Sequence, residues 1–266
     1  MKVRFLGYGS NSFGSINTVS FLLYHNESVA LFDCGTSVTN NLHAVVPNFC
    51  DITHVYISHS HFDHFLGLPY FIIGRHLDGI AQKKNNPDYI PSPLKVYIPE
   101  ELIDVTKNLI SICHKDVARL SYEVEYYPIC AESDIDFEEL KISPFASDHT
   151  VATYGAVVKL GEDKLLGYSS DTLYNEKIID ALRGCRYLVL EGMVPDCEQV
   201  FSDKAKHATF SQMTDVVGRL RPEMAFVVHL QPRYLSRQAE IAEAIDCIPG
   251  SKIVFPEIGE TYVLRV

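Results

Sequence analysis

The 266-residue sequence has no apolar run of the roughly 18–20 residues that a membrane-spanning helix requires. Its start, MKVRFLGYGSNSFG, contains no long apolar segment, so we expect no secretory signal. The seven cysteines are an odd number, and no two of them form a CxxC pair. That spacing is typical of reduced, mostly buried thiols and not of a disulfide framework or a thiolate zinc site. We therefore predict a cytoplasmic protein that is not inserted in a membrane.

Basic residues are also scarce, because 23 lysines and arginines stand against 34 aspartates and glutamates. The formal net charge of −11 argues against extended, nonspecific binding of nucleic acid, which needs a basic face. One local basic pocket would still be compatible with this charge. Hydrophobic residues make up 47% of the chain, which is ordinary for a globular protein with a sizeable core.

The order of apolar runs indicates strands first, with helices interleaved afterwards. We predict a polar, proline-rich loop over 81–93, and a helix after His64 that Pro69 breaks early. The expected strands are 3–6, 19–24, 29–32, 54–57, 95–98, 122–127, 140–143, 155–159, 164–168, 187–190, 224–228 and segments near Ile253 and 262–264, and the other expected helices are 36–46, 174–182, 210–220 and 236–244. This pattern favours an α+β fold in which helices cover packed sheets. Without a linker-like segment, residues 1–266 are interpreted as a single domain.

The most informative motif is His59-Ser60-His61-Phe62-Asp63-His64. Imidazole nitrogens and carboxylate oxygens are good zinc ligands, and zinc requires several of them to converge on one point. Alternate residues of an extended segment point the same way, so His59 and His61 can bind one metal. Asp63 and His64, on the turn just beyond, can reach a second metal.

Three further candidate ligands are His149, Asp171 and His229. Asp171 and His229 follow the short apolar runs LLGYSS and MAFVV, and His149 stands a few residues past an expected strand. Loops at strand ends often aim side chains at one point. Five histidines and two aspartates suit two metals about 3.5–4 Å apart if one carboxylate bridges them and a hydroxide lies between them. Zinc is the expected metal, with manganese or iron as possible substitutes because such sites are permissive.

HSHFDH, SDHT, SSDT and VVHLQPRY resemble the metal motifs of the metallo-β-lactamase superfamily, in particular its ribonuclease Z-like phosphodiesterases. The resemblance extends over nearly the whole chain and includes RFLGYGS and the FDCG segment at 32–35. It implies a four-layer αββα sandwich with two zinc ions at one edge. It also implies which residues bind them: His59, His61 and His149 for one zinc, Asp63, His64 and His229 for the other, with Asp171 as the bridge.

Cleavage of a phosphodiester also needs a proton for the leaving oxygen. His207, in KAKHATF, is our candidate donor, and the resemblance implies that Glu191 supports it. The alternative is that His207 caps the helix beginning near Phe210 while Glu191 is exposed. Asp63 is a second catalytic candidate, because it could orient the zinc-bound hydroxide. For contacts to phosphate, the candidates are Lys206, Arg233 and Tyr234, although the lysine is equally compatible with a solvated surface.

Ribonuclease Z usually carries an inserted arm between the third histidine and the bridging aspartate. Here residues 150–170 suffice only for a β-hairpin turning at Gly161-Glu162-Asp163, and Ser170 replaces the usual glycine before Asp171. Together with the acidic balance, this favours a small substrate, since a large RNA requires a positive surface away from the reacting phosphate. The sequence is similar to armless relatives, among them anti-Pycsar proteins, that act on cyclic nucleotides and form homodimers.

We therefore predict a zinc-dependent phosphodiesterase of a small, cyclic nucleotide, assembled as a homodimer. The alternative is tRNA 3′-processing of the ribonuclease Z type, with RNA as the partner. Hydrolysis of a lactone, thioester or cyclic phosphate is a third possibility within the superfamily. A catalytically inert metal-binding scaffold is a different class. It is disfavoured because every expected ligand and the proposed acid are intact, and it should keep its partner when His61→Ala removes the metal site.

Overall fold

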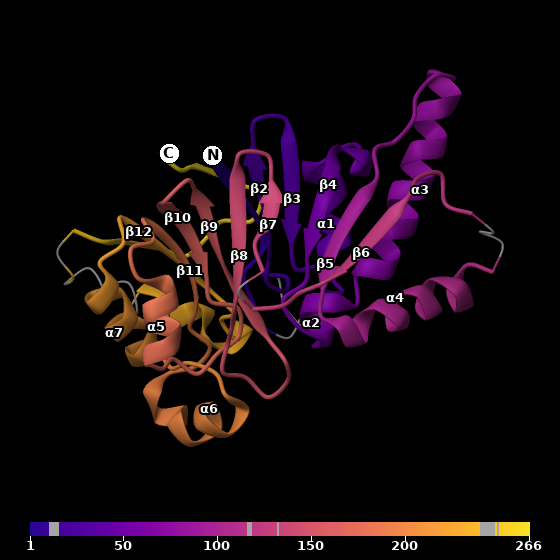
Figure 1. The fold of residues 1–266 in the computed structure, drawn as a ribbon. Helices are drawn as coiled ribbons and strands as arrows, with labels where there is room; N and C mark the ends of the chain where they lie inside the picture. Colours follow the sequence, from indigo (N-terminus) through magenta and orange to yellow (C-terminus); the bar gives the residue numbers. More distant parts are fainter. Residues whose placement is uncertain (11–15, 116–118, 132, 240–247, 249) are drawn as a thin grey trace.

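Two seven-stranded sheets pack face to face in the computed structural model, which describes residues 1–10, 16–115, 119–131, 133–239, 248 and 250–266 (Figure 1). The strand order of the first sheet is β14-β1-β2-β3-β4-β5-β6. Its strands are β1 (Lys2–Gly7), β2 (Ser20–His25), β3 (Ser28–Phe32), β4 (Ile52–Tyr56), β5 (Leu94–Ile98), β6 (Val124–Pro128) and β14 (Thr261–Val263). Because β14 pairs with β1, the two chain ends lie side by side, with Lys2 opposite Val263.

The second sheet has the order β13-β12-β11-β10-β9-β8-β7. Its strands are β7 (Ile135–Phe137), β8 (Leu140–Ala146), β9 (Tyr154–Leu160), β10 (Asp163–Tyr168), β11 (Tyr187–Glu191), β12 (Met224–Val228) and β13 (Lys252–Val254). Strands β7 to β10 form antiparallel hairpins, whereas β10 to β13 are parallel. The first sheet divides in the same way, with antiparallel pairs from β14 to β3 and parallel pairs from β3 to β6.

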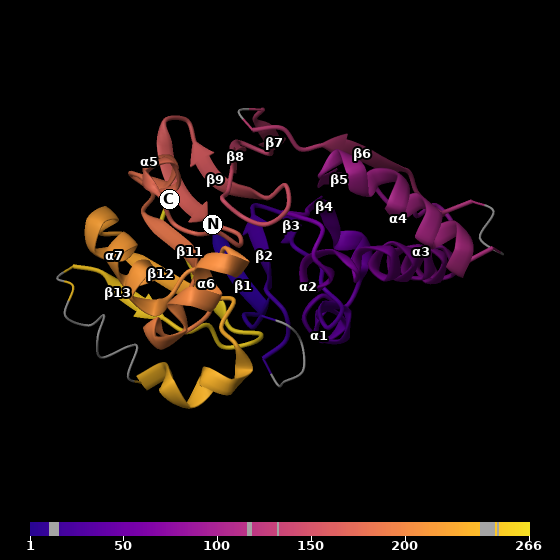
Figure 2. The ribbon, with the colours of Figure 1, turned by 90° about the horizontal axis from the view of Figure 1, so that it is seen from below.

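Helices cover the outer face of each sheet (Figures 1 and 2). The helices are α1 (Val38–Val45), α2 (Phe62–Phe65), α3 (Leu68–Asn85), α4 (Glu100–Cys113), α5 (Glu176–Leu182), α6 (Gln199–Ala205) and α7 (Phe210–Leu220), with 3₁₀ turns η1 (Phe49–Asp51), η2 (Asp196–Glu198) and η3 (Pro232–Arg237). Figure 2 shows α3 and α4 extending away from the second sheet. No helix in the described ranges is long and apolar enough to cross a membrane.

Three apolar clusters separate the layers. The central cluster joins the facing sides of the two sheets, where Phe5 packs on Phe226 with ring centroids 5.0 Å apart. A second cluster lies between the first sheet and α1, α3 and α4, and a third between the second sheet and α5 and α7. The layers are therefore helix, sheet, sheet and helix, which confirms the predicted α+β sandwich.

The carboxyl ends of the parallel strands place the polar residues of interest at one edge of the sandwich. Strand β4 runs into His59, β10 into Asp171 and β12 into His229, while β3 leads into Asp33 and β11 ends at Glu191. Strands that run in the same direction end at the same edge of their sheet, so their following loops meet there. This edge is the lower one in Figure 1, where α2 and α6 lie.

Most predicted elements are present, with the helix 210–220 and the strand 224–228 at their predicted bounds. The prediction that Pro69 breaks a helix is wrong, because Pro69 stands in the first turn of α3, where its missing N–H costs nothing. That helix continues to Asn85, so the predicted loop 81–93 begins five residues too early. Much of the helix predicted over 236–244 lies outside the described residues.

Three α-helices and one strand were not predicted: α2, which was expected only as a turn, α4, α6 and β7. Helix α4 carries several β-branched residues, which lower its intrinsic propensity, and it is stabilised by packing against α3 and β6. Helix α6 has only seven residues, too few for a periodic pattern to stand out.

Candidate metal centre

The HSHFDH segment changes from extended chain to helix within the motif. His59 follows β4, and His61 has extended dihedral angles and is the N-cap of α2. Asp63 and His64 are in the first turn of α2. The segment therefore presents His61 from extended backbone and Asp63 and His64 from a short helix, at the place where the sequence indicated a turn.

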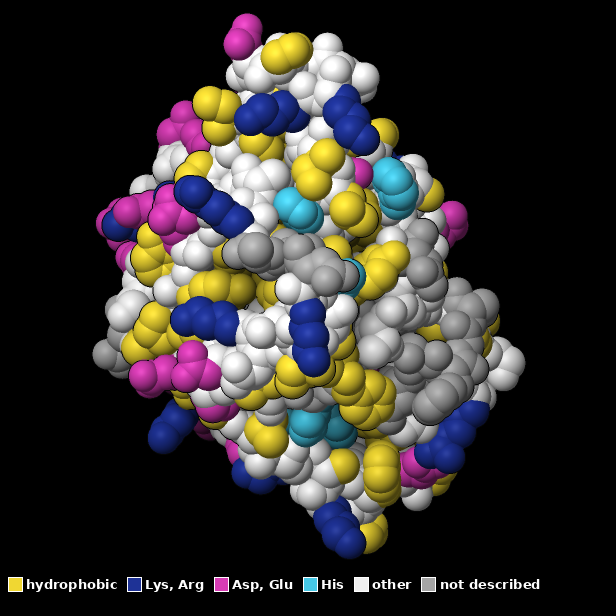
Figure 3. All heavy atoms as spheres, turned by 90° about the vertical axis from the view of Figure 1, so that its right-hand side faces the viewer, with side chains coloured by type: hydrophobic (Ala, Val, Ile, Leu, Met, Phe, Trp, Pro, Cys, Tyr) yellow, Lys and Arg dark blue, Asp and Glu magenta, His cyan; other side chains and the backbone are white. Residues whose placement is uncertain are grey.

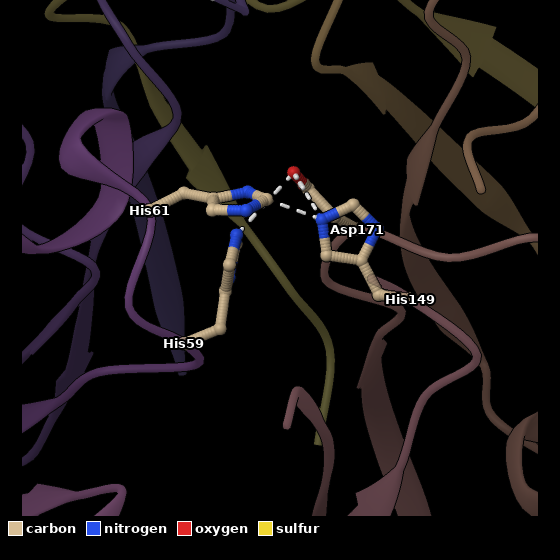
Figure 4. Close-up of side chains that lie close together, drawn as sticks. All are labelled: His59, His61, His149 and Asp171. Atoms are coloured by element: carbon tan, nitrogen blue, oxygen red, sulfur yellow. Dashed lines mark hydrogen bonds and ion pairs between the residues drawn. The ribbon is translucent and has the colours of Figure 1, made fainter. Parts of the chain in front are cut away.

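Asp171 lies at the centre of the candidate ligands. One of its carboxylate oxygens, Oδ2, lies within 4.0 Å of the Nε2 atoms of four histidines: His229 at 3.1 Å, His64 at 3.4 Å, His59 at 3.5 Å and His149 at 4.0 Å. Figure 4 shows the side chains of His59, His61, His149 and Asp171 pointing toward one another. His59 and His61 come from the segment between β4 and α2, and His149 and Asp171 from the segments that follow β8 and β10. A central carboxylate surrounded by imidazoles is the arrangement that a bridging ligand requires.

Two further contacts complete the geometry of the cluster. Nε2 of His149 lies 3.2 Å from Nδ1 of His61, and Oδ2 of Asp63 lies 3.4 Å from Nε2 of His229. Nδ1–H of His149 donates to the backbone carbonyl of Lys206 at 3.0 Å. This bond fixes the tautomer of His149 and leaves Nε2 as its lone-pair donor toward the cluster.

Two residues at or beside the candidate ligand positions have left-handed backbone conformations. Ser170 has a φ of +52° and His229 a φ of +63°. Few residues other than glycine adopt such angles, and when they do the surrounding structure must hold them there. Ser170 therefore takes the conformation that the glycine usual at this position would supply, and the carboxylate of Asp171 still reaches the cluster.

Several buried polar atoms of the cluster make no hydrogen bond. Nε2 of His59, His64 and His229 and Oδ2 of Asp171 are buried, and none makes a hydrogen bond of acceptable geometry. Buried polar atoms without hydrogen bonds are rare and costly. Their convergence fits a cation that would satisfy them, and both the nitrogen and oxygen donors suit a divalent metal. The three potential ligand groups share members around Asp171: His59, His61, His149 and Asp171; Asp63, His64 and His229; and Asp171, Glu191, His207 and His229.

Asp33 positions the cluster from behind, a role that the sequence did not reveal. It is fully buried with a φ of +55°. Its Oδ2 accepts from Nδ1 of His64 at 2.8 Å, from the hydroxyl of Ser58 at 2.9 Å and from the hydroxyl of Tyr168 at 2.5 Å. Its Oδ1 accepts from the backbone N–H of Ser58 at 2.7 Å. In the sequence, the FDCG segment indicates only a family resemblance. The contact between Asp33 and Tyr168 joins residues 135 positions apart, so no local spacing predicts it.

Burial and charge set the protonation of the ligands. Burial lowers the pKa of His59 well below its ordinary value and that of His149 to about 4, so both rings are neutral and ready to bind metal at neutral pH. Burial would raise the pKa of Asp171, but His229 and His64 outweigh it and hold that carboxyl ionised. Burial would likewise lower the pKa of His64, yet Asp171 and Asp33 raise it well above the ordinary value. The carboxylates of Asp171 and Asp33 therefore stabilise a positive charge near His64, and either a proton or a metal cation can supply that charge.

His207 and Glu191 form a buried pair beside the cluster. Nδ1 of His207 lies 2.9 Å from Oε2 of Glu191, whose other oxygen accepts from the N–H of Ala208 at 2.6 Å. Burial would lower the pKa of His207, but the Glu191 carboxylate outweighs it and raises that pKa to about 9. The capping alternative fails, because Thr209 is the N-cap of α7 and forms a capping box with Gln212. Glu191 is not exposed either.

A cavity of about 230 Å³ opens onto His207 of this pair and onto part of the cluster. Its lining consists of His61, Phe62, Asp63, Asp171, Met193, Phe201, His207 and His229. The candidate acid and four of the candidate ligands, His61, Asp63, Asp171 and His229, therefore face one space in which a small molecule can lie.

The structure does not bring the predicted phosphate contacts into this lining. Arg233 pairs with Glu198, with Nη2 and Oε2 2.7 Å apart, and the Tyr234 hydroxyl also donates to Glu198. Lys206 pairs with Asp148 through Nζ and Oδ1 at 2.7 Å. As substrate contacts these three residues stay predictions, since each would first have to leave a carboxylate partner.

The αββα layers and the histidine–aspartate cluster at one edge define a metallohydrolase of the metallo-β-lactamase superfamily. A human tRNase Z short form (ELAC1) is similar in structure, with a TM-score of 0.80, 18% identity and full coverage of both chains. The metallo-β-lactamase fold protein YhfI from Bacillus subtilis has a TM-score of 0.78 at 15% identity, covering 98% of each chain.

Sequence comparison gives the family. A ribonuclease Z of Enterococcus faecalis is 23% identical over 96% of this chain and 95% of its own. The family model described as anti-Pycsar protein Apyc1 matches residues 1–246. The chain belongs to this family, which confirms the predicted ribonuclease Z-like branch.

Proposed function

We propose that this protein is a metal-dependent phosphodiesterase that hydrolyses a small, cyclic nucleotide. The observation that carries the proposal is one cavity with two kinds of chemistry on its walls. A cluster of metal-ligand type lies on one side, and the buried His207–Glu191 pair lies beside it. Hydrolysis of a phosphodiester needs both, because the attacking water must be activated and the leaving oxygen must be protonated.

The proposed enzyme binds two divalent cations. We propose zinc, with manganese or iron as substitutes. Two ligand groups support the assignment made from the sequence: His59, His61, His149 and Asp171 for one cation, and Asp63, His64 and His229 for the other. Asp171 would be shared, because its Oδ2 also lies 3.4 Å from Nε2 of His64 and 3.1 Å from Nε2 of His229. When bound there, such cations supply an activated water and neutralise charge on the phosphate. Asp63 lines the cavity beside His229, where it could also orient that water.

The chain itself supplies the proton. Oxygen of water forms a new bond to phosphorus, one P–O ester bond breaks, and the leaving oxygen takes a proton from His207. Glu191 engages Nδ1 of His207, which leaves Nε2 for the substrate. The same carboxylate favours the protonated ring, as a general acid requires.

The loop architecture supports a small substrate. Between His149 and Asp171 the chain forms only the β9–β10 hairpin, whose strands join through a short turn with Gly161 at a φ of +58°. No arm extends from this hairpin to hold a distant part of a folded RNA. Membership of the family described as anti-Pycsar protein Apyc1 agrees with this choice, which rests on the sequence resemblance to armless phosphodiesterases of cyclic nucleotides.

Ribonuclease Z-type processing of tRNA is the second candidate. It is favoured by the relatives named ribonuclease Z and by the similarity to a human tRNase Z. The alignment with the Enterococcus relative spans 310 positions although this chain has 266 residues, so that relative carries segments absent here. The net charge of −11 also disfavours a large polyanion.

A homodimer is also part of the proposal. An apolar groove of about 320 Å³ lies between α2, α3 and α4, and its lining includes Leu66, Tyr70 and Ile110. Leu66 is 45% exposed and Tyr70 65%. Figure 3 shows exposed hydrophobic side chains among lysines and arginines on the face that these helices form. Sedimentation of the wild type and of Tyr70→Lys tests whether a second copy covers this groove.

One substrate panel tests the function. The purified protein is assayed with 3′,5′-cyclic nucleotides and with precursor tRNA, and its metal content is measured by elemental analysis. We expect turnover of the cyclic nucleotides and about two zinc ions per chain. Asp171→Ala should lose metal and activity together. Turnover of precursor tRNA alone would instead support the second candidate, and a metal-free active protein would contradict both.

A further inference from the structure

Two phenylalanine rings lie in the lining of the cavity and are open to solvent. Phe62 is 45% exposed and Phe201 is 44% exposed. Every other phenylalanine whose burial the structure describes is buried or half-buried. The two most exposed phenyl rings thus line the same cavity, and the mechanism makes no use of them.

The sequence positions of the two rings place them on different elements of the site. Phe62 stands in α2 between the candidate ligands His61 and Asp63, so the backbone that carries it is fixed by the cluster. Phe201 stands in α6, 139 positions later, on the chain segment that leads to His207. One ring therefore belongs to the metal side of the cavity and the other to the acid side.

Ion pairs fix both ends of α6, the helix that carries Phe201. Before α6, Glu198 pairs with Arg233 and accepts from the Tyr234 hydroxyl. After α6, Lys206 pairs with Asp148, and its carbonyl accepts from His149. The residues that the sequence indicated as phosphate contacts thus serve here to fix the helix that presents Phe201.

We propose that Phe62 and Phe201 bind the nucleobase of the substrate by stacking, while its phosphate lies at the His/Asp cluster. This inference rests on the proposed function and names the subsite within it. An exposed phenyl ring gains by covering its face, and a nucleobase offers a flat π surface of matching size. Stacking of this kind tolerates different bases, because every base has a π face. The subsite therefore selects for the presence of a base and only weakly for its identity.

The test compares two substrates that share the reacting group. One is a 3′,5′-cyclic nucleotide, and the other is the same ribose 3′,5′-cyclic phosphate with a methyl group in place of the base. Phe201→Ala should raise KM for the nucleotide about tenfold and leave the base-free substrate unchanged. Phe201→Tyr should restore the wild-type KM, whereas Phe201→Leu, which is apolar without a π face, should not. Phe62→Ala should resemble Phe201→Ala while keeping its metal.

Val200→Ala is the matched control, because Val200 lies on the same helix, is 85% exposed and is not part of the cavity lining. Equal losses on both substrates, or rescue by Phe201→Leu, would overturn the stacking role. A wild type that cleaves neither substrate contradicts the proposed function instead. Calorimetric titration with the cyclic nucleotide then still tests the subsite, and binding that Phe201→Ala does not weaken would overturn it.

Discussion

At the scale of single residues, the surroundings shift the pKa of the candidate acid His207 and of the candidate ligands His59 and His149 in opposite directions. Burial keeps His59 and His149 neutral, whereas Glu191 keeps His207 protonated. Histidine thus serves two purposes at one site: Nδ1 of His207 is hydrogen-bonded to a carboxylate, whereas Nδ1 of His149 is hydrogen-bonded to a backbone carbonyl.

His207→Ala should therefore slow hydrolysis of an ordinary phosphodiester by a factor of about 100 or more without loss of metal. A substrate with an activated leaving group such as p-nitrophenolate should suffer less, because that group departs without a proton. Steady-state kinetics on both substrates, with elemental analysis of the variant, measure this. Equal losses on the two substrates would contradict proton donation by His207.

Asp33→Asn should weaken metal binding by about 10- to 100-fold, although Asp33 lies behind the cluster. The amide keeps the size of the side chain but removes the negative charge that His64 Nδ1–H faces. Competition with a chromogenic zinc chelator gives the affinity. Asp134→Asn, at an exposed aspartate that accepts from Ser143, is the control. An unchanged affinity in Asp33→Asn would show that the hydrogen bond to His64 does not tune the site.

At the scale of elements, His54 links the stability of the first sheet to pH. Its ring, in β4, stacks parallel to Tyr97 and packs edge-on against Phe137, with ring centroids 6.2 and 5.0 Å away. Burial, with help from Lys95, lowers the pKa of His54 to about 4. The unfolded chain, with an ordinary value of 6.5, binds the proton first, so acid favours unfolding.

As the pH falls from 6.5 to about 4, the unfolded chain binds a proton at His54 before the folded chain does, so the folded state should lose stability. Above that window His54 is neutral in both states, and its protonation costs no stability. The loss of stability amounts to at most about 3 kcal/mol. Urea unfolding of the wild type and of His54→Gln at neutral and mildly acidic pH measures it. The wild type should lose more stability than the variant, and equal losses would show that other groups carry the acid sensitivity.

Element prediction from the sequence succeeded where side chains alternate or repeat over a long enough run. The buried face of β12 and the capping box at Thr209 of α7 are local signals, and both elements were predicted at their bounds. Helix α4 was missed because its β-branched residues weaken its own helical signal, while packing against α3 and β6 stabilises it. Pro69 was misread because a proline begins a helix as readily as it ends one.

At the scale of the whole molecule, the cluster joins the two sheets. His59 and His64 come from the first sheet and its loops, and Asp171 and His229 from the second. β14, near the C-terminus, completes the first sheet beside β1. That residues 1–266 form one domain stays a prediction. A cation bound at the cluster would tie both halves together, so its free energy of binding adds to the stability of the whole fold.

Removal of metal with a chelator should lower Tm by about 5–10 °C, because a ligand at 100 times its Kd contributes about 2.7 kcal/mol. Zinc should restore the original Tm. Asp171→Ala should show a low Tm that neither chelator nor zinc changes. Differential scanning calorimetry measures all three, and a wild-type Tm that the chelator leaves unchanged would argue against a structural contribution of the metal.

The sequence by itself determined the donor types and their positions at strand ends. HSHFDH, Asp171 and His229 could be read because alternation, apolar runs and motif spacing are local properties, whereas the support of His207 by Glu191 was implied only by the family resemblance. Only the tertiary structure decided that Asp33 holds His64 and Tyr168, that Glu198 engages Arg233 and Tyr234, and that Phe62 and Phe201 line one cavity. These contacts join residues far apart in the chain, and they follow from how the two sheets pack and not from any nearby sequence pattern.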